Sequence, residues 1–147
     1  MNTSIEEFIA GKSIAVVGAS RTNKNKFGNM AATELKRRGY QVYFVHPQAE
    51  SIDGETAYPS LSALSGRVDG VLVSVPAARG ADVLREAAEM GLRNVWVQQG
   101  GESVELIQLG EELQLNLVTG KCILMYAQPV RGFHGFHRFI ARLSGQL

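Results

Sequence analysis

Short apolar runs alternate with segments of helical periodicity along most of this 147-residue chain. The runs cover residues 13–17, 41–45, 70–75 and 94–97, with a shorter one at 117–119. Strands that lack a regular polar side are typical of a parallel sheet buried on both faces. Between them, apolar residues recur every three or four positions, which predicts helices over 27–38, 78–90 and 102–115. Strand and helix in strict alternation indicate an α/β architecture.

The order of these segments also restricts the topology. Crossovers between neighbouring parallel strands are almost always right-handed. We therefore expect a single Rossmann-like three-layer sandwich over residues 1–147, with a parallel sheet of about five strands. Thr3 and Glu6 have capping-box spacing, which predicts an opening helix over residues 3–10. Residues 48–66 give a mixed pattern with a turn into a short helix at Tyr58–Leu61, and residues 126–147 predict a loop with an extra C-terminal helix.

Composition excludes several classes of protein. A net charge of +1 argues against a polyanion-binding surface, so nucleic acid is not an expected partner. One cysteine cannot form an internal disulfide, and no apolar run reaches the roughly 20 residues of a membrane span. The acidic, amphipathic start of the chain is unlike a secretory signal. We expect a cytoplasmic protein with no membrane association.

The segment after the first strand is the strongest candidate for a binding site. The strand ends in Gly18, the following loop carries Arg21, Lys24 and Lys26, and a helix begins at Phe27. A helix N-terminus presents free backbone N–H groups and about half a positive charge, which suits a phosphate. The added cations predict a site for a phosphorylated organic ligand.

Other loops should reach the same site. In an open parallel sheet, ligands bind beyond the carboxyl ends of the strands, so four loops should converge: residues 18–26, 46–47, 75–76 and 98–101. The first loop lacks the G-x-G-x-x-G fingerprint of dinucleotide sites, and the second strand ends in His46, where an NAD site usually has an acidic residue. The basic loop suits a ligand with more phosphate charge than NAD. Coenzyme A, which has a 3′-phosphate beside its diphosphate, meets this requirement.

An ordered set of short motifs resembles a known family over nearly the whole chain. The motifs are Val16-Val17-Gly18-Ala19-Ser20, Gly39-Tyr40-Gln41-Val42, Val45-His46-Pro47, Tyr58-Pro59-Ser60-Leu61, Val75-Pro76, Trp96-Val97-Gln98-Gln99-Gly100 and Lys121-Cys122-Ile123. The set resembles small stand-alone CoA-binding proteins of bacteria. These are similar to the N-terminal CoA-binding domain of succinyl-CoA synthetase alpha subunits. The family usually has Val-Asn-Pro where this chain has Val45-His46-Pro47. The contacts that the asparagine side-chain amide would make are therefore changed.

The resemblance implies a binding site for coenzyme A or an acyl-CoA. It places the first loop at the phosphates, Pro47 on the adenosine side and Gln98 farther along the ligand. The expected cofactor-binding residues are Gly18, Ala19, Ser20, Arg21, Lys26, His46, Pro47, Val75, Pro76 and Gln98. Val75 and Pro76 would lie against the adenine or the pantetheine. The second synthetase domain, with its phosphorylated histidine, has no room in this chain, so the synthetase reaction is not transferred.

No catalytic motif stands out, and the chain is interpreted as a binding protein. It has neither a G-x-S-x-G elbow nor a G-x-x-x-x-G-K-[ST] loop. Ser20 would donate to a phosphate or cap the following helix. Cys122 is either a small core residue or a thiol that exchanges with the CoA sulfhydryl. His134 and His137 are too few for a closed metal site, so no metal is expected.

Two other functions stay open at this point. One is a fragment of an NAD(P)-dependent oxidoreductase, and the other is a regulatory module that senses a nucleotide and signals through its terminal helix. The second requires a homodimer or a protein partner.

Overall fold

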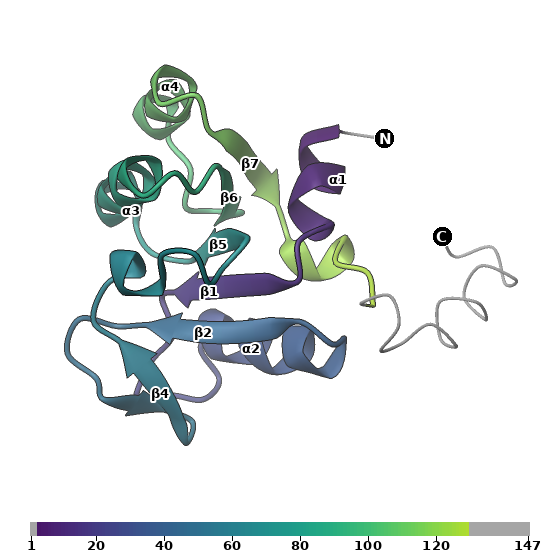
Figure 1. Ribbon diagram of the computed structural model, residues 1–147, viewed down its shortest axis with the longest axis vertical. Coiled ribbons are helices and arrows are strands. Elements are labelled where there is room, and N and C mark those ends of the chain that lie inside the picture. Colours follow the sequence, from purple (N-terminus) through teal and green to yellow (C-terminus); the bar gives the residue numbers. More distant parts are fainter. Residues whose placement is uncertain (1–2, 130–147) are drawn as a thin grey trace, which may run out of the picture.

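A sheet of seven strands runs through the centre of the computed structural model, which describes residues 3–129 (Figure 1). The strand order is β3-β4-β2-β1-β5-β6-β7. The strands are β1 (Ser13–Val17), β2 (Gln41–Val45), β3 (Ser51–Ile52), β4 (Glu55–Tyr58), β5 (Gly70–Val73), β6 (Asn94–Gln98) and β7 (Asn116–Lys121). All neighbouring pairs are parallel except β3 and β4. The Rossmann-like α/β fold predicted from the sequence is confirmed, with seven strands instead of about five.

The two additional strands form a hairpin within the region of mixed pattern. Asp53 and Gly54 join β3 to β4 with φ angles of 50° and 82°. Positive φ at both central residues is the geometry of a two-residue type I′ turn, for which Asp-Gly is a favoured pair. The 3₁₀ helix η1 (Leu61–Leu64) follows, in agreement with the short helix expected there.

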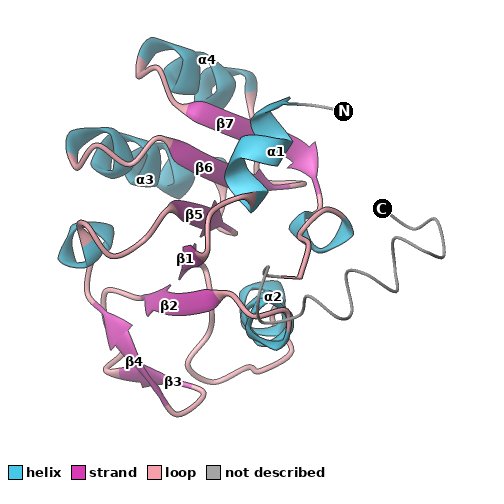
Figure 2. Cartoon of the chain, turned by 45° about the vertical axis from the view of Figure 1, so that its right-hand side comes forward, coloured by secondary structure: helices cyan, strands magenta, loops and turns pink. Residues whose placement is uncertain are grey.

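Helices cover both faces of the sheet. On one face lie α1 (Thr3–Ile9), α2 (Phe27–Arg37) and the 3₁₀ helix η2 (Ile123–Met125), and on the other lie α3 (Ala77–Glu89), α4 (Val104–Glu112) and η1 (Figure 2). Each α-helix lies within three residues of its predicted bounds, whereas η2 was not predicted. The predicted C-terminal helix lies outside the described residues. No helix in the described part of the chain has both the length and the apolar character of a membrane span.

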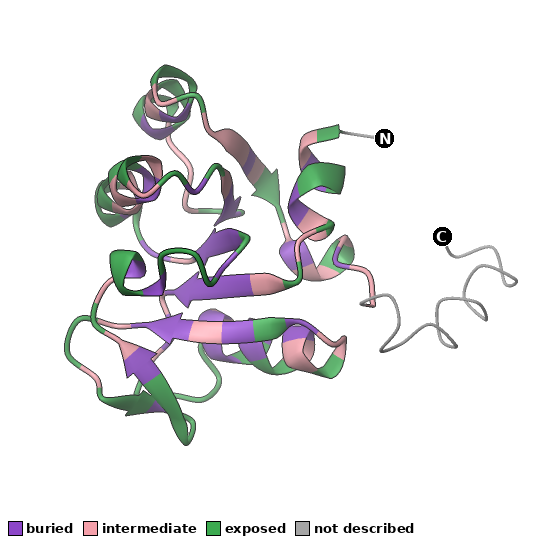
Figure 3. Cartoon of the chain, in the orientation of Figure 1, coloured by how far each residue is buried: buried purple, intermediate pink, exposed green. Residues whose placement is uncertain are grey.

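Both faces of the central strands are buried, which explains their apolar composition (Figure 3). In β1, Ile14 and Val16 belong to the core under α2, whereas Ala15 and Val17 belong to the core under α3. Trp96 is fully buried and meets Phe8 edge to face, with ring centroids 5.3 Å apart. The central strands therefore gain stability from apolar contacts on both faces of the sheet.

The strand order defines one switch point in the sheet. From β1 the chain proceeds to β2 on one side, and it later crosses to β5 on the other side of β1. Val17 is in register with Val45 and with Val73, so the loops after β1, β2 and β5 begin side by side. In open α/β sheets, ligands bind beyond the carboxyl ends of the strands at this position.

Candidate functional site

The loop after β1 is held against β5 and α2 by two glycines. Gly18 has a φ of +122°, and a Cβ there would lie 2.2 Å from the carbonyl oxygen of Ser74. A Cβ on Gly28 would lie 2.9 Å from the backbone nitrogen of Ala19. Close approach of the backbone accounts for both glycines. A bulky residue at Gly18 would displace the backbone at Ser74, directly after β5, so its effect on a ligand could not be separated from its effect on the fold.

A buried asparagine fixes the same loop. Asn29, 1 % exposed, accepts a hydrogen bond from the Ser20 N–H at 2.6 Å and donates one to the Ser20 carbonyl at 2.8 Å. Its amide also donates to Oδ2 of Asp53 at 3.1 Å, which ties the loop to the β3–β4 turn. The sequence analysis missed Asn29. The one signal for it in the sequence was that its side-chain amide stands in the first turn of the predicted helix, next to the apolar face of that helix.

The Ser20 hydroxyl caps a turn within the loop. Its Oγ accepts hydrogen bonds from the N–H groups of Thr22, at 3.1 Å, and Asn23, at 3.0 Å. The expectation that Ser20 caps the next helix is wrong, because α2 begins seven residues later, after Lys26, whose side chain makes no capping hydrogen bond. Among residues 3–129, the N–H groups of Phe27 and Gly28 have no acceptor. Such groups can bind an anion.

A cavity of about 570 Å³ lies beside this helix end, beyond β5 and β6. It brings together four of the predicted residues, Lys26, Val75, Pro76 and Gln98, with Ser74 and the 99–101 loop. Its volume is in the range of cofactor pockets, roughly 300 to 1,000 Å³. The other six predicted residues do not line it: Gly18, Ala19, Ser20 and Arg21 lie in the neighbouring loop, and His46 and Pro47 follow β2.

Gln98 brings a polar group to the wall of this cavity. The residue is only 8 % exposed, and its Oε1 accepts a hydrogen bond from the Ile123 N–H at 3.1 Å. That contact fixes which end of the amide is oxygen. The Nε2 group has no acceptor in the described part of the chain, so it is a buried donor available to a ligand.

His46 stabilises the turn that follows β2. Its Nδ1 accepts hydrogen bonds from the N–H groups of Gln48 and Ala49, both at 3.0 Å. An asparagine oxygen can accept such bonds in an Asx turn, so His46 supplies the acceptor that the family's amide would provide. The neutral ring carries its proton on Nε2 and presents a second donor there.

Positive charge gathers around His46. Burial lowers the pKa of the imidazole from its ordinary value, and the charges of Arg21, Arg79 and Lys26 lower it further. None of these three cations belongs to an ion pair within residues 3–129. Arg79, in the first turn of α3, was not predicted from the sequence. The carboxyl edge of the sheet therefore carries unneutralised positive charge, which favours an anionic ligand.

A second cavity, of about 460 Å³, lies between α3 and α4. Within the described residues, Arg85 is the one cation that lines it, and Glu105 and Glu112 also line it. Its net charge makes it a poor phosphate site compared with the cavity at the switch point.

Two other predicted features are less informative. Cys122 is half-buried at the start of η2, so it is neither a fully enclosed core residue nor an open thiol. His134 and His137 lie outside the described residues.

A Rossmann-like sheet with a positively charged cavity at its switch point defines a class of domain that binds phosphorylated cofactors. Residues 12–128 match the family described as CoA binding domain, and the chain belongs to this family. The CoA-binding part of the resemblance seen in the sequence is confirmed, and the finer likeness to bacterial stand-alone proteins and succinyl-CoA synthetase alpha subunits stays a prediction.

Among curated proteins, the chain is similar to two ADP-forming acetate–CoA ligases. It is 35 % identical over 96 residues to acetate–CoA ligase [ADP-forming] II of Archaeoglobus fulgidus. This matched segment covers 64 % of this chain and 14 % of that protein. It is 28 % identical over 130 residues to the acetate–CoA ligase [ADP-forming] II alpha subunit of Pyrococcus furiosus. This second match covers 81 % of this chain and 28 % of that protein. The chain thus matches less than a third of either relative.

Solved structures include whole chains of this shape. A conserved hypothetical protein from Pyrococcus furiosus is 35 % identical, with a TM-score of 0.73, over 77 % of this chain and 97 % of that one. A hypothetical protein from Pyrococcus horikoshii is 27 % identical, with a TM-score of 0.74, over 84 % of this chain and 87 % of that one.

Proposed function

We propose that this protein binds coenzyme A, free or as an acyl thioester, in the cavity at the switch point of the sheet. The observation that carries the proposal is the position of this cavity. It lies at the N-terminus of α2 and is lined by Lys26, which belongs to no ion pair within residues 3–129, in a chain of the CoA binding domain family. Coenzyme A combines a multiply charged phosphate end with a long, weakly polar tail, and the cavity offers surfaces for both.

The cavity suggests an order for the parts of the ligand. The diphosphate lies at Lys26 and the free N–H groups of Phe27 and Gly28, beside the backbone of Gly18, Ala19 and Ser20. The adenosine lies toward Pro47, beyond β2. The pantetheine passes Val75 and Pro76, and the Gln98 amide donates to one of its carbonyl oxygens.

We propose no catalysis for this chain. The acetate–CoA ligases contain much more than the matched segment, and their reaction is not assigned here. One of them is an alpha subunit, which is consistent with a domain that works beside a protein partner. The sequence motifs extend the likeness to succinyl-CoA synthetase alpha subunits and to bacterial stand-alone proteins. A single cysteine suits a cytoplasmic location.

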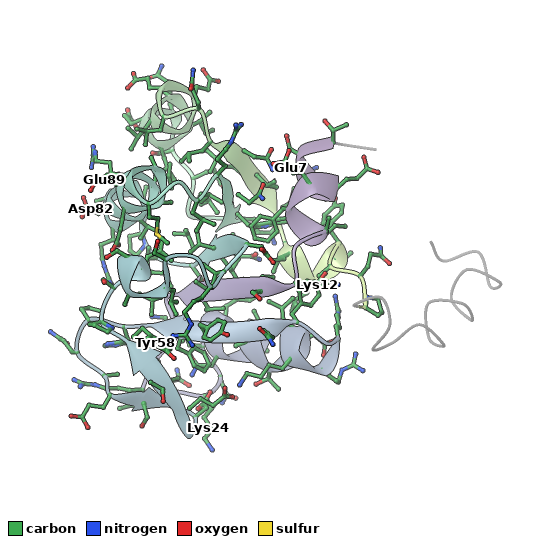
Figure 4. All side chains as sticks on the ribbon, in the orientation of Figure 1. Glu7, Lys12, Lys24, Tyr58, Asp82 and Glu89 are labelled. Atoms are coloured by element: carbon green, nitrogen blue, oxygen red, sulfur yellow. The ribbon has the colours of Figure 1, made fainter. Side chains whose placement is uncertain are left out.

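Calorimetric titration with coenzyme A tests the proposal through two charge reversals. Lys26→Glu places a negative charge at the cavity and should weaken binding at least tenfold and reduce its dependence on salt. Lys12→Glu makes the same change in net charge before β1, at the amino end of the strand (Figure 4), and should alter the affinity less than about twofold. Equal losses in both variants, or no binding by the wild type, would contradict the proposal.

A further inference from the structure

We propose that β7 is a dimer interface, at which this strand pairs antiparallel with β7 of a second copy of the chain. The sheet then continues across a twofold axis into the sheet of the second copy. This surface is separate from the switch-point cavity, and the inference does not depend on the ligand bound there. It rests on the backbone groups, the apolar side chains and the charges at this edge of the molecule.

The free backbone groups of β7 are the first support. The strand is the last in the sheet and pairs with β6 alone among the strands that the structure describes (Figure 2). The Asn116 N–H donates to the Arg93 carbonyl at 2.8 Å, so Asn116 turns its backbone groups toward β6. Because this direction alternates along a strand, Val118 does the same, whereas Leu117 and Thr119 direct their N–H and C=O groups away from β6. Within residues 3–129 these four groups have no partner, and such an edge can pair with another strand.

The spacing of these groups is complementary to itself. In an antiparallel ladder, two residues that lie opposite each other can exchange both of their N–H···O=C hydrogen bonds. A twofold axis between the two copies of Val118 brings Leu117 of each copy opposite Thr119 of the other. Four hydrogen bonds then form, and all of them use groups that are unpaired in the single copy. Residues 116–119 contain no proline and no charged side chain, the usual features that prevent such pairing.

Exposed apolar side chains of α4 flank the same edge. Val104 is 66 % exposed and Ile107 is 36 % exposed. Neither lines the groove between α3 and α4, so both turn away from α3. The helix packs on β7, where Gly110 lies directly against the Leu117 side chain. A twofold axis perpendicular to the sheet places α4 of the two copies side by side on one face, and contact between them removes these apolar side chains from water.

The charges of this edge are also complementary. The last turn of α4 contains Glu111 and Glu112 and no basic residue, so the negative end of this helix has no cation of its own helix beside it. Lys121 ends β7 and is exposed. In the twofold arrangement Lys121 lies level with Leu115 of the second copy, shortly after the end of that copy's α4. Glu112 lines the groove toward α3 and Glu111 does not, so Glu111 is the expected partner of Lys121. Opposite charges at both ends of the interface favour this register.

Sedimentation equilibrium of the full chain tests the pairing of the strands. The wild type should dimerise with a dissociation constant below about 100 μM. Thr119→Pro removes one outward N–H group from each copy, at a position where an edge strand tolerates proline, and should weaken the dimer at least tenfold. Circular dichroism shows whether this variant is folded. A monomeric wild type at about 200 μM, or a dimer that Thr119→Pro does not weaken, would overturn the proposal.

A charge exchange tests the register independently. Lys121→Glu and Glu111→Lys each place like charges at both ends of the dimer, and each alone should weaken it at least fivefold. An equimolar mixture of the two variants should dimerise within about twofold of the wild-type affinity, because the mixed pair has opposite charges at both ends. Misfolded variants could not restore each other in this way.

Glu112→Lys is the matched control, since it makes the same charge change on the neighbouring residue, which faces α3. It should alter the dissociation constant of the dimer less than about twofold. A mixture that stays monomeric, or a control that loses as much affinity as Glu111→Lys, would overturn the interface. Calorimetry with coenzyme A on the same variants reports on the cavity separately, so either proposal can fail without the other.

Discussion

His46 is a residue whose structural role depends on its protonation state. Its Nδ1 accepts two backbone hydrogen bonds, which only a ring without a proton on that nitrogen can do. Burial and the neighbouring charges of Arg21, Arg79 and Lys26 lower its pKa further below the ordinary value of 6.5. The turn after β2 is therefore most stable when His46 is neutral.

This predicts a loss of stability in mild acid. The unfolded chain binds the proton of His46 more tightly than the folded protein does, so the free energy of unfolding should fall as the pH drops below about 6.5. His46→Asn keeps an acceptor for the two N–H groups but does not titrate. Urea unfolding at about pH 8 and pH 5.5 should show a smaller loss in this variant. The same loss in both proteins would rule out His46 as its source.

Asn29 connects the phosphate loop to the hairpin, and its removal should affect both. Asn29→Ala leaves the Ser20 N–H and carbonyl without their partner and should cost about 1–3 kcal/mol of unfolding free energy. Asn25→Ala, in the exposed part of the same loop, should change the unfolding free energy by less than about 0.5 kcal/mol. Denaturant unfolding measures both. Similar values for the two variants would show that the buried amide does not hold the loop.

At the scale of the elements, two helical glycines have opposite roles. Gly28 of α2 lies against the backbone of Gly18 and Ala19, where a Cβ would approach within 2.9 Å. Gly80 of α3 faces side chains of Leu106 and Val73, where a Cβ would lie at an ordinary 3.7 Å. Only the first glycine is needed for close packing.

Alanine at each position separates these roles. Gly28→Ala should lower the unfolding free energy by about 1–3 kcal/mol and weaken CoA binding, because α2 must move away from the loop. Gly80→Ala should raise the unfolding free energy by about 0.5–1 kcal/mol through the higher helix propensity of alanine. Thermal unfolding with and without coenzyme A measures both effects. An unchanged unfolding free energy in Gly28→Ala would contradict the close packing of α2 on the loop after β1.

The accuracy of the sequence prediction followed the burial of the elements. Strands β1 and β2 have the predicted bounds because apolar contacts on both faces give them a continuous apolar pattern. The β3–β4 hairpin was missed because only Ile52 and Ala57 are buried in its six residues, and the Asp53-Gly54 turn was its one clear signal.

The candidate site was predictable to a similar extent. Lys26, Val75, Pro76 and Gln98 could be grouped because the carboxyl ends of parallel strands meet at one edge. Arg79 and Asn29 could not, since a helical pattern does not show which exposed residue turns to that edge or which amide is buried.

At the scale of the whole molecule, the switch point divides the sheet into β3-β4-β2-β1 and β5-β6-β7. The loop after β1 provides Lys26, and the second half provides Val75, Pro76 and Gln98. A ligand in the cavity contacts both halves, which lie on one continuous sheet. Neither half contains the complete proposed site.

A crystal structure with coenzyme A tests this account most directly. We expect the diphosphate at hydrogen-bonding distance, about 2.7–3.2 Å, from the N–H groups of Phe27 and Gly28, with Lys26 alongside. Coenzyme A bound instead in the groove between α3 and α4, with the switch-point cavity empty, would contradict the account.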